Sequence, residues 1–204
     1  TLFPYTTLFR SYYGEMAVRT DASSRFGKDH RWGMFWSLGL MWNIKNEPFL
    51  KDIEWLTGAQ IALSTGTSGN SEIPYYDHLA LVSGGPKYND EAGIYPKQSG
   101  NEELSWEQTW SNNIGLRLGF FNRVNLDIDF YHKKTTDMLM SVPESYAITG
   151  EGYRWDNIGA MVNRGVEVSV NSDIIRTKDF TWNLNANVSY NKNKLVELYN
   201  GVQE

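Results

Sequence analysis

The sequence predicts an all-β protein whose long antiparallel strands form part of a transmembrane β-barrel. The stretch Trp110–Met140 reads as a β-hairpin, because apolar and polar side chains alternate along both arms and only residues 121–123 lie between them. Each arm has about a dozen residues, whereas strands of globular proteins usually have about five or six. Strands of this length with one apolar and one hydrated face are typical of a wall between lipid and a water-filled lumen.

The polar face of this hairpin predicts the lumen side of the wall. Arg117 lies on the first arm, and Asp127 and Asp129 lie on the second. Because these positions alternate with apolar ones, we expect all three side chains to face the lumen. Asp127 and Asp129 would be about 7 Å apart, which also suits a paired-carboxylate site. The alternation favours the other interpretation, in which both carboxylates simply face the water-filled lumen.

The same alternation predicts the other strands. Further strands are expected over residues 14–21, 32–46, 55–65, 157–172 and 180–191, which gives about seven in a meander. Successive connections of a meander lie at opposite ends, and the connections alternate between long and short along the chain. Outer-membrane barrels have this asymmetry, with long loops outside and short turns in the periplasm. A soluble sandwich has no reason to sort its loops by end.

Two long loops are the candidate binding surface. Residues 66–103 and 141–156 are rich in turn-forming residues, and we expect the first of them to be structureless and either functional or mobile. Their aromatic side chains could stack on sugar rings, contact a partner protein, or pack within the loops. These candidates are Tyr75, Tyr76, Tyr88, Tyr95, Tyr146, Tyr153 and Trp155.

Tryptophans near the predicted strand ends indicate the aromatic girdles that mark the two faces of a membrane. The residues with this placement are Trp32, Trp55, Trp106, Trp110, Trp155 and Trp182. No apolar run approaches the roughly 18 residues of a transmembrane helix. In a barrel only alternate residues meet lipid, so the mean hydropathy of −0.48 is compatible with spanning strands.

Several function classes are disfavoured by composition. The net charge of −5 gives no basic face for nucleic acid. The chain has no cysteine, and His30, His78 and His132 lack the short spacing of a metal site. Glycine-rich stretches at 66–69 and 150–152 precede no helical pattern, so they read as turns and not as phosphate-binding loops. We therefore expect no enzyme activity, no catalytic residue, no cofactor and no metal.

Six segments resemble the SusC/RagA family of TonB-dependent outer-membrane receptors, in the order that the family shows them. The first two are DASSRFG at 21–27, similar to D-G-S-S-R-F-G, and WGMFWSLGLMWNIKNEPF at 32–49, similar to W-G-x-F-P-S-x-S-x-x-W-x-x-x-x-E-x-F. The others are GTSGN at 66–70, LSWEQT at 104–109, YHKKTTDML at 131–139 and NIGAMVNRGVEV at 157–168. Ala22 and Trp36 depart from the family pattern, which bears on local loop geometry.

The resemblance implies a fragment of a larger receptor. A family member has a 22-stranded barrel closed around an N-terminal plug, so residues 12–204 would form an incomplete barrel with no plug. The implied function is TonB-dependent import of a glycan or peptide across the outer membrane of a Bacteroidetes-like bacterium. The implied partners are a SusD-like surface lipoprotein, the TonB complex through the missing N-terminal part, and the lipid bilayer. Residues 1–11 (TLFPYTTLFRS) match nothing in this pattern, and we expect a non-native or disordered leader.

A second interpretation from another class stays open. The many aromatic residues and the modest hydropathy also suit a secreted or surface β-rich carbohydrate-binding module. A glycoside hydrolase fragment would need a cleft with two positioned carboxylates, which the sequence does not indicate.

Overall fold

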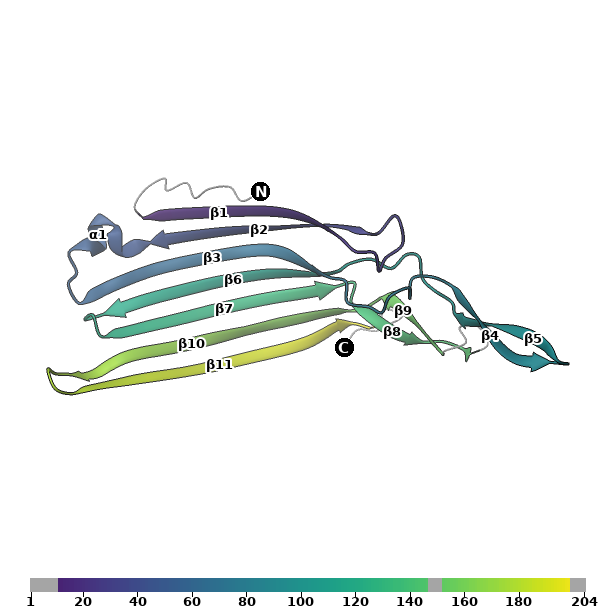
Figure 1. Ribbon diagram of the computed structural model, residues 1–204. Helices are drawn as coiled ribbons and strands as arrows, with labels where there is room; N and C mark the ends of the chain where they lie inside the picture. Colours follow the sequence, from purple (N-terminus) through teal and green to yellow (C-terminus); the bar gives the residue numbers. More distant parts are fainter. Residues whose placement is uncertain (1–10, 147–151, 199–204) are drawn as a thin grey trace.

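The computed structural model describes residues 11–146 and 152–198, and its main feature is one seven-stranded antiparallel sheet (Figure 1). The strand order is β1-β2-β3-β6-β7-β10-β11, so each long strand pairs with the next long strand of the chain. The long strands are β1 (Tyr12–Ala22), β2 (Trp32–Asn43), β3 (Leu56–Asn70), β6 (Glu107–Phe120), β7 (Val124–Thr136), β10 (Ala160–Arg176) and β11 (Thr181–Glu197). The predicted meander of seven long strands is confirmed.

The sheet is open and curved. Strands β1 and β11 form its two edges and do not pair with each other in the part of the chain that the structure describes. Within residues 11–146 and 152–198, no second layer packs on the sheet (Figure 1). The sheet is therefore a wall segment and not half of a sandwich.

The β6–β7 connection is a tight turn, as the alternation predicts. Phe121 and Asn122 both have positive φ, 55° and 54°, and the Arg123 amide donates a hydrogen bond to the Phe120 carbonyl at 2.9 Å. Two central residues with positive φ define a type I′ turn, whose twist matches that of the strands it joins. The pairing then runs from Phe120 opposite Val124 outward along the hairpin.

The end of the sheet that holds this turn, called the turn end below, also holds the β2–β3 and β10–β11 connections (Figure 1). The strand predicted through Asn46 ends at Asn43, because Ile44–Asn46 form a 3-10 helix and Pro48–Lys51 form the short helix α1. Proline suits the first turn of a helix, where its missing N–H is not needed. This connection is longer than the 23–31 loop at the other end, so the sorting of connections by length is incomplete.

The opposite end, called the loop end, carries two further hairpins that extend beyond the sheet (Figure 1). They are β4 (Leu81–Tyr88) with β5 (Glu91–Gln98), and β8 (Leu139–Pro143) with β9 (Tyr153–Asn157). The expected structureless loop at 66–103 is thus wrong in two respects. Residues 66–70 belong to β3, and most of the remainder is a hairpin whose turn has positive φ at Asn89 and Asp90.

The strand register sorts side chains onto two faces. One cross-strand row of the first face contains Leu63, Ile114, Phe130, Val166 and Tyr190. The adjacent row of the other face contains Ser64, Asn113, Tyr131, Gly165 and Asn191. We call these the apolar face and the polar face. Large side chains of the apolar face lie exposed, and Val188 has 72% of its surface accessible.

Among the described residues, no helix has the length and apolar character needed to cross a membrane.

A small core lies at the loop end and not between layers. Phe26, Ile73 and Leu104 are buried there, with Trp106, Leu139 and Trp155 packed against them. These residues come from the 23–31 loop, from both ends of the 71–106 connection, and from β8 and β9. One core therefore joins all three connections of the loop end.

Candidate functional site: the polar face and the loop end

The polar face brings the three predicted charged residues close together. Arg117 on β6 lies directly opposite Asp127 on β7, and its Nε is 3.9 Å from Asp127 Oδ1. Both side chains are about half exposed, so water screens this ion pair and its contribution to stability is small. The carboxylate of Asp129 lies over Gly115, since a Cβ at Gly115 would be 2.7 Å from Asp129 Oδ1.

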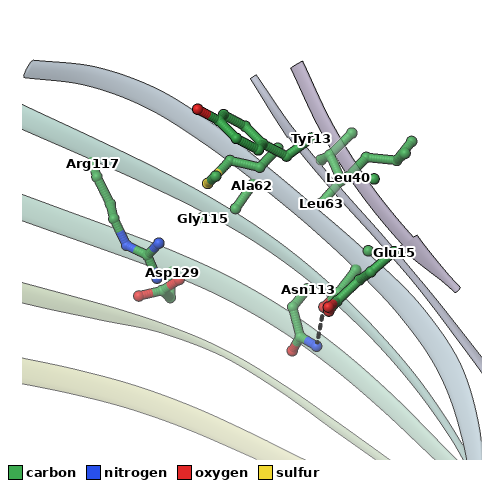
Figure 2. A pocket seen from close by; sticks show the side chains of 13 residues that line it. Tyr13, Glu15, Leu40, Ala62, Leu63, Asn113, Gly115, Arg117 and Asp129 are labelled. Carbon is green, nitrogen blue, oxygen red and sulfur yellow. Dashed lines mark hydrogen bonds between the residues drawn. The ribbon is translucent and has the colours of Figure 1, made fainter. Parts of the chain in front are cut away.

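Arg117, Asp129 and Gly115 border a shallow hollow on the polar face, whereas Asp127 does not line it (Figure 2). Its floor has small residues, Gly39 on β2, Ala62 on β3 and Gly115 on β6. Figure 2 shows Arg117 and Asp129 on one side of the hollow and Glu15 on the other. A Cβ at Gly39 would be 2.9 Å from Glu15 Cγ, so the Glu15 chain crosses the floor there.

The hollow offers hydrogen-bonding groups of both kinds. Asn113 donates from Nδ2 to Ser64 Oγ at 3.1 Å and keeps its carbonyl oxygen for another donor. Carboxylates, a guanidinium and amides on a hydrated surface can bind hydroxyl groups or peptide groups through hydrogen bonds, without forming a covalent bond. No group of three or more His, Cys, Asp or Glu side chains able to hold a metal occurs in residues 11–146 and 152–198.

Asparagine side chains tie the loop end together. Asn157 Nδ2 donates to the carbonyls of Ser105 and Asp137, both at 2.9 Å, and its Oδ1 accepts from the Ser105 amide at 2.8 Å. Asn101 Nδ2 donates to the Trp155 carbonyl at 3.2 Å and to Asp156 Oδ1 at 3.1 Å. The connection before β6 is thereby fixed to β9.

The base of the β4–β5 hairpin is closed by a second set of bonds. Gln98 Nε2 donates to the carbonyls of Tyr76 and Leu79, both at 2.7 Å. The Asn101 amide donates to the His78 carbonyl at 3.2 Å. The hairpin is therefore held at its base, while its strands extend away from the sheet (Figure 1).

The predicted aromatic residues divide into three groups. Tyr75, Tyr76 and Tyr146 are the most exposed, with 66%, 64% and 75% of their surfaces accessible. Tyr95 lies over Gly85, Tyr153 begins β9, and Tyr88 ends β4. Trp155 packs on the loop-end core. Tyr95 and Tyr153 are less exposed, with 43% and 37% of their surfaces accessible.

Two of the six tryptophans predicted at membrane interfaces lie elsewhere. Trp106 and Trp155 pack on the loop-end core, and the Trp106 indole donates a hydrogen bond to the Arg31 carbonyl at 3.0 Å. The other four are at least half exposed near strand ends. They are Trp32, Trp55, Trp110 and Trp182.

Sequence reasoning missed the residues that position the loops. Phe26 and Leu104 each stand alone among polar neighbours, so no periodicity marks them as core. Arg25 was also missed: its guanidinium lies 4.7 Å from the centre of the Tyr75 ring, and its Nη1 donates to the Ser71 carbonyl at 3.3 Å. The available signal for Phe26 and Leu104 was that each is an isolated apolar residue inside a polar loop.

Known proteins are similar to this chain in both sequence and fold. The family model for the TonB dependent receptor-like beta-barrel matches residues 11–203. The TonB-dependent receptor SusC of Bacteroides thetaiotaomicron is 39% identical over 96% of this chain and 20% of its own length. TonB-dependent receptor P39 of Formosa agariphila is 39% identical over 89% of this chain and 18% of its own length.

A solved structure of the RagAB peptide importer in its closed-closed state superposes with a TM-score of 0.88. It is 38% identical, and the match covers 95% of this chain and 21% of that one. The chain thus spans about a fifth of the length of the relatives it matches. It belongs to the TonB-dependent receptor β-barrel family, in the SusC/RagA branch.

Proposed function

We propose that this chain forms part of the barrel wall and outer loops of a receptor that imports a glycan or peptide nutrient across the outer membrane with TonB-supplied energy. The observation that carries the proposal is the division of one tall sheet into an exposed apolar face and a polar face. Bilayer lipid would cover the first face, and the water-filled lumen would lie against the second. Membership of the SusC/RagA branch supports the same placement.

The turn end then lies in the periplasm and the loop end outside the cell, as in other outer-membrane barrels. The β4–β5 and β8–β9 hairpins would contact cargo and a SusD-like surface lipoprotein there. Tyr75, Tyr76 and Tyr146 are the best placed of the predicted aromatics, because their rings are exposed. Arg117, Asp127 and Asp129 would line the lumen below them.

Deleting the β4–β5 hairpin in the full-length receptor tests this role. Joining Ala80 to Ser99 removes residues 81–98 and leaves the Asn101 to His78 bond that helps to close the base. We expect lower uptake of labelled oligosaccharide or peptide and less co-purified lipoprotein, with unchanged amounts of heat-modifiable receptor in the outer membrane. Normal uptake together with normal co-purification would contradict the role of the hairpin.

A soluble carbohydrate-binding module is the second candidate, and the exposed loop tyrosines are the observation that favours it. The exposed apolar face weighs against it, because contiguous apolar patches this large are rare on soluble monomers. Fractionation of cells that express the full-length protein separates the two. A barrel needs detergent for extraction, whereas a binding module is released in aqueous buffer.

A further inference from the structure

At the loop end of three neighbouring strands, the side chains of the apolar face change from apolar to basic. Five basic side chains lie there on β7, β10 and β11, and all five are exposed. We call this set the basic belt. Its members are His132, Lys134, Arg164, Lys192 and Lys194.

The strand register places the basic belt in two adjacent cross-strand rows. Arg164 lies directly opposite His132 on one side and Lys192 on the other. Lys134 and Lys194 lie opposite Val162 in the next row toward the loop end. Neighbouring strands are about 4.8 Å apart and successive rows of one face about 7 Å apart. Five basic groups therefore share an area about 10 Å wide and 7 Å tall at their Cα atoms.

The basic belt borders the apolar rows directly. The row next to it toward the turn end holds Phe130, Val166 and Tyr190, and further apolar rows follow it. Trp110 lies opposite Lys134 and has half of its surface exposed. Tyrosine and tryptophan favour the boundary between hydrocarbon and headgroups. The basic belt thus starts where the apolar band ends.

No carboxylate on this face balances the basic belt. On β7 and β10, Asp127, Asp129 and Glu167 all lie on the polar face. In the paired register from Tyr12 to Lys194, the apolar face of the described strands holds no aspartate or glutamate. None of the five side chains has a salt bridge within the described ranges. Like charges directly opposite each other, as Arg164 and Lys192 are, destabilise a sheet unless an anion lies between them.

We propose that the basic belt binds the phosphate groups of an anionic outer-leaflet lipid, whose acyl chains lie on the apolar rows beside it. Guanidinium and ammonium groups form charge-assisted hydrogen bonds with phosphate oxygens. A lipid source is favoured over free phosphate because the charged rows continue an apolar surface that only an amphiphile can cover. The inference rests on the proposed function in one respect, that the sheet stands in a bilayer.

Lipid binding by the full-length receptor in detergent tests the proposal, with native mass spectrometry as the readout. The probes are phosphorylated lipid A, the same lipid with its phosphates removed, and inorganic phosphate as a competitor. The variant Arg164→Gln with Lys192→Gln removes two charges from the basic belt. The control Lys133→Gln with Lys178→Gln removes two charges from the polar face and the turn end.

We expect the basic-belt variant to bind phosphorylated lipid A about 30-fold more weakly, since each cation near an anionic surface contributes about 1 kcal/mol. The control variant and the dephosphorylated lipid should show no such difference. Equal binding by both variants would overturn the proposal, and competition by inorganic phosphate at equal affinity would overturn the lipid source. If the basic-belt variant loses co-purified lipoprotein while its lipid binding is unchanged, the lipid proposal is overturned and the basic belt is a protein interface. Receptor found outside the membrane fraction would instead refute the proposed function.

Discussion

The side chain of Asn157 and the backbone of Ser105 bond to each other in both directions, although 52 residues separate them. Nδ2 donates to the Ser105 carbonyl at 2.9 Å, and Oδ1 accepts from the Ser105 amide at 2.8 Å. This side chain completes the backbone hydrogen bonding of a segment that belongs to no strand. It thereby fixes the start of β6 against the end of β9.

Asn157→Ala should therefore loosen the loop end and leave the sheet intact. The substitution removes three hydrogen bonds, each worth about 1 kcal/mol net, so the local opening equilibrium should rise by about 150-fold. Limited proteolysis of the full-length receptor, followed by mapping of cuts within residues 71–106, measures this. Asn191→Ala is the control, because this asparagine is exposed on the polar face. Equal cutting of both variants would contradict the role of Asn157.

The loop-end core gives a second prediction. Phe26 is fully buried and its ring lies edge-on to Trp106, with centroids 5.6 Å apart. Phe26→Ala should destabilise the loop end by about 3–5 kcal/mol through lost burial and the cavity left behind. Hydrogen exchange should become faster at residues 23–31 and 71–106 and stay unchanged in β7 and β10. Phe49→Ala, which truncates an exposed ring on α1, is the control. Unchanged exchange at the loop end would refute this account.

The sequence predicts the sheet well and the loop end poorly, for physical reasons. In a barrel wall every second side chain of a strand faces lipid. Alternation in a segment such as residues 124–131 therefore predicts both that the segment pairs as a strand and on which face each side chain lies. The loop-end core is assembled from single residues far apart in the chain, and Phe26 and Leu104 follow no period. The β4–β5 hairpin was missed because Gly84, Gly85 and Pro86 read as loop. The Asn89–Asp90 pair was the signal, since both residues tolerate positive φ.

The charged and aromatic candidates show the same limit. Alternation placed Arg117, Asp127 and Asp129 on one face, and the register brings Arg117 opposite Asp127. Alternation could not indicate which loop aromatics are exposed, since exposure depends on contacts such as that of Tyr95 with Gly85.

Close packing on the polar face makes Gly165 sensitive to substitution. An added Cβ would meet the Tyr190 carbonyl oxygen of the neighbouring strand and lie 2.5 Å from the Tyr131 hydroxyl. The backbone atom cannot move aside easily, so Gly165→Ala should lower the free energy of unfolding by about 1–3 kcal/mol. Urea unfolding of the full-length receptor in vesicles measures the change. Gly84→Ala has nothing within 4 Å of the added Cβ and should cost less, so equal losses would argue against the packing explanation.

The turn end contains a pH-dependent contact. The Trp42 indole donates to Glu47 Oε1 at 3.1 Å, and this bond, with one from Ser11, lowers the pKa of the Glu47 carboxyl below its ordinary 4.5. A carboxyl with a lowered pKa in the folded state stabilises that state above its ordinary pKa. The stabilisation is lost as the pH falls from 4.5 through the lowered value.

Trp42→Phe should therefore destabilise the receptor more at pH 6 than at pH 3. Unfolding midpoints of both proteins across this range measure the difference. In the control Trp110→Phe, the lost bond goes to the neutral Thr65 hydroxyl, so its cost should not vary with pH. Parallel pH profiles for wild type and Trp42→Phe would refute the role of the Trp42–Glu47 bond.

Adjacent positions on β10 test which face meets lipid. Val168 lies opposite Ile128 and Val188 on the apolar face, and Ser169 lies opposite Asp127 and Asn187 on the polar face. An arginine in the middle of the lipid-facing band costs about 2–4 kcal/mol, whereas a lumen position keeps its hydration. Val168→Arg should therefore lower both the free energy of unfolding in vesicles and the amount of receptor in the outer membrane. Ser169→Arg should lower neither, and a loss at Ser169 with tolerance at Val168 would reverse the assignment of the two faces.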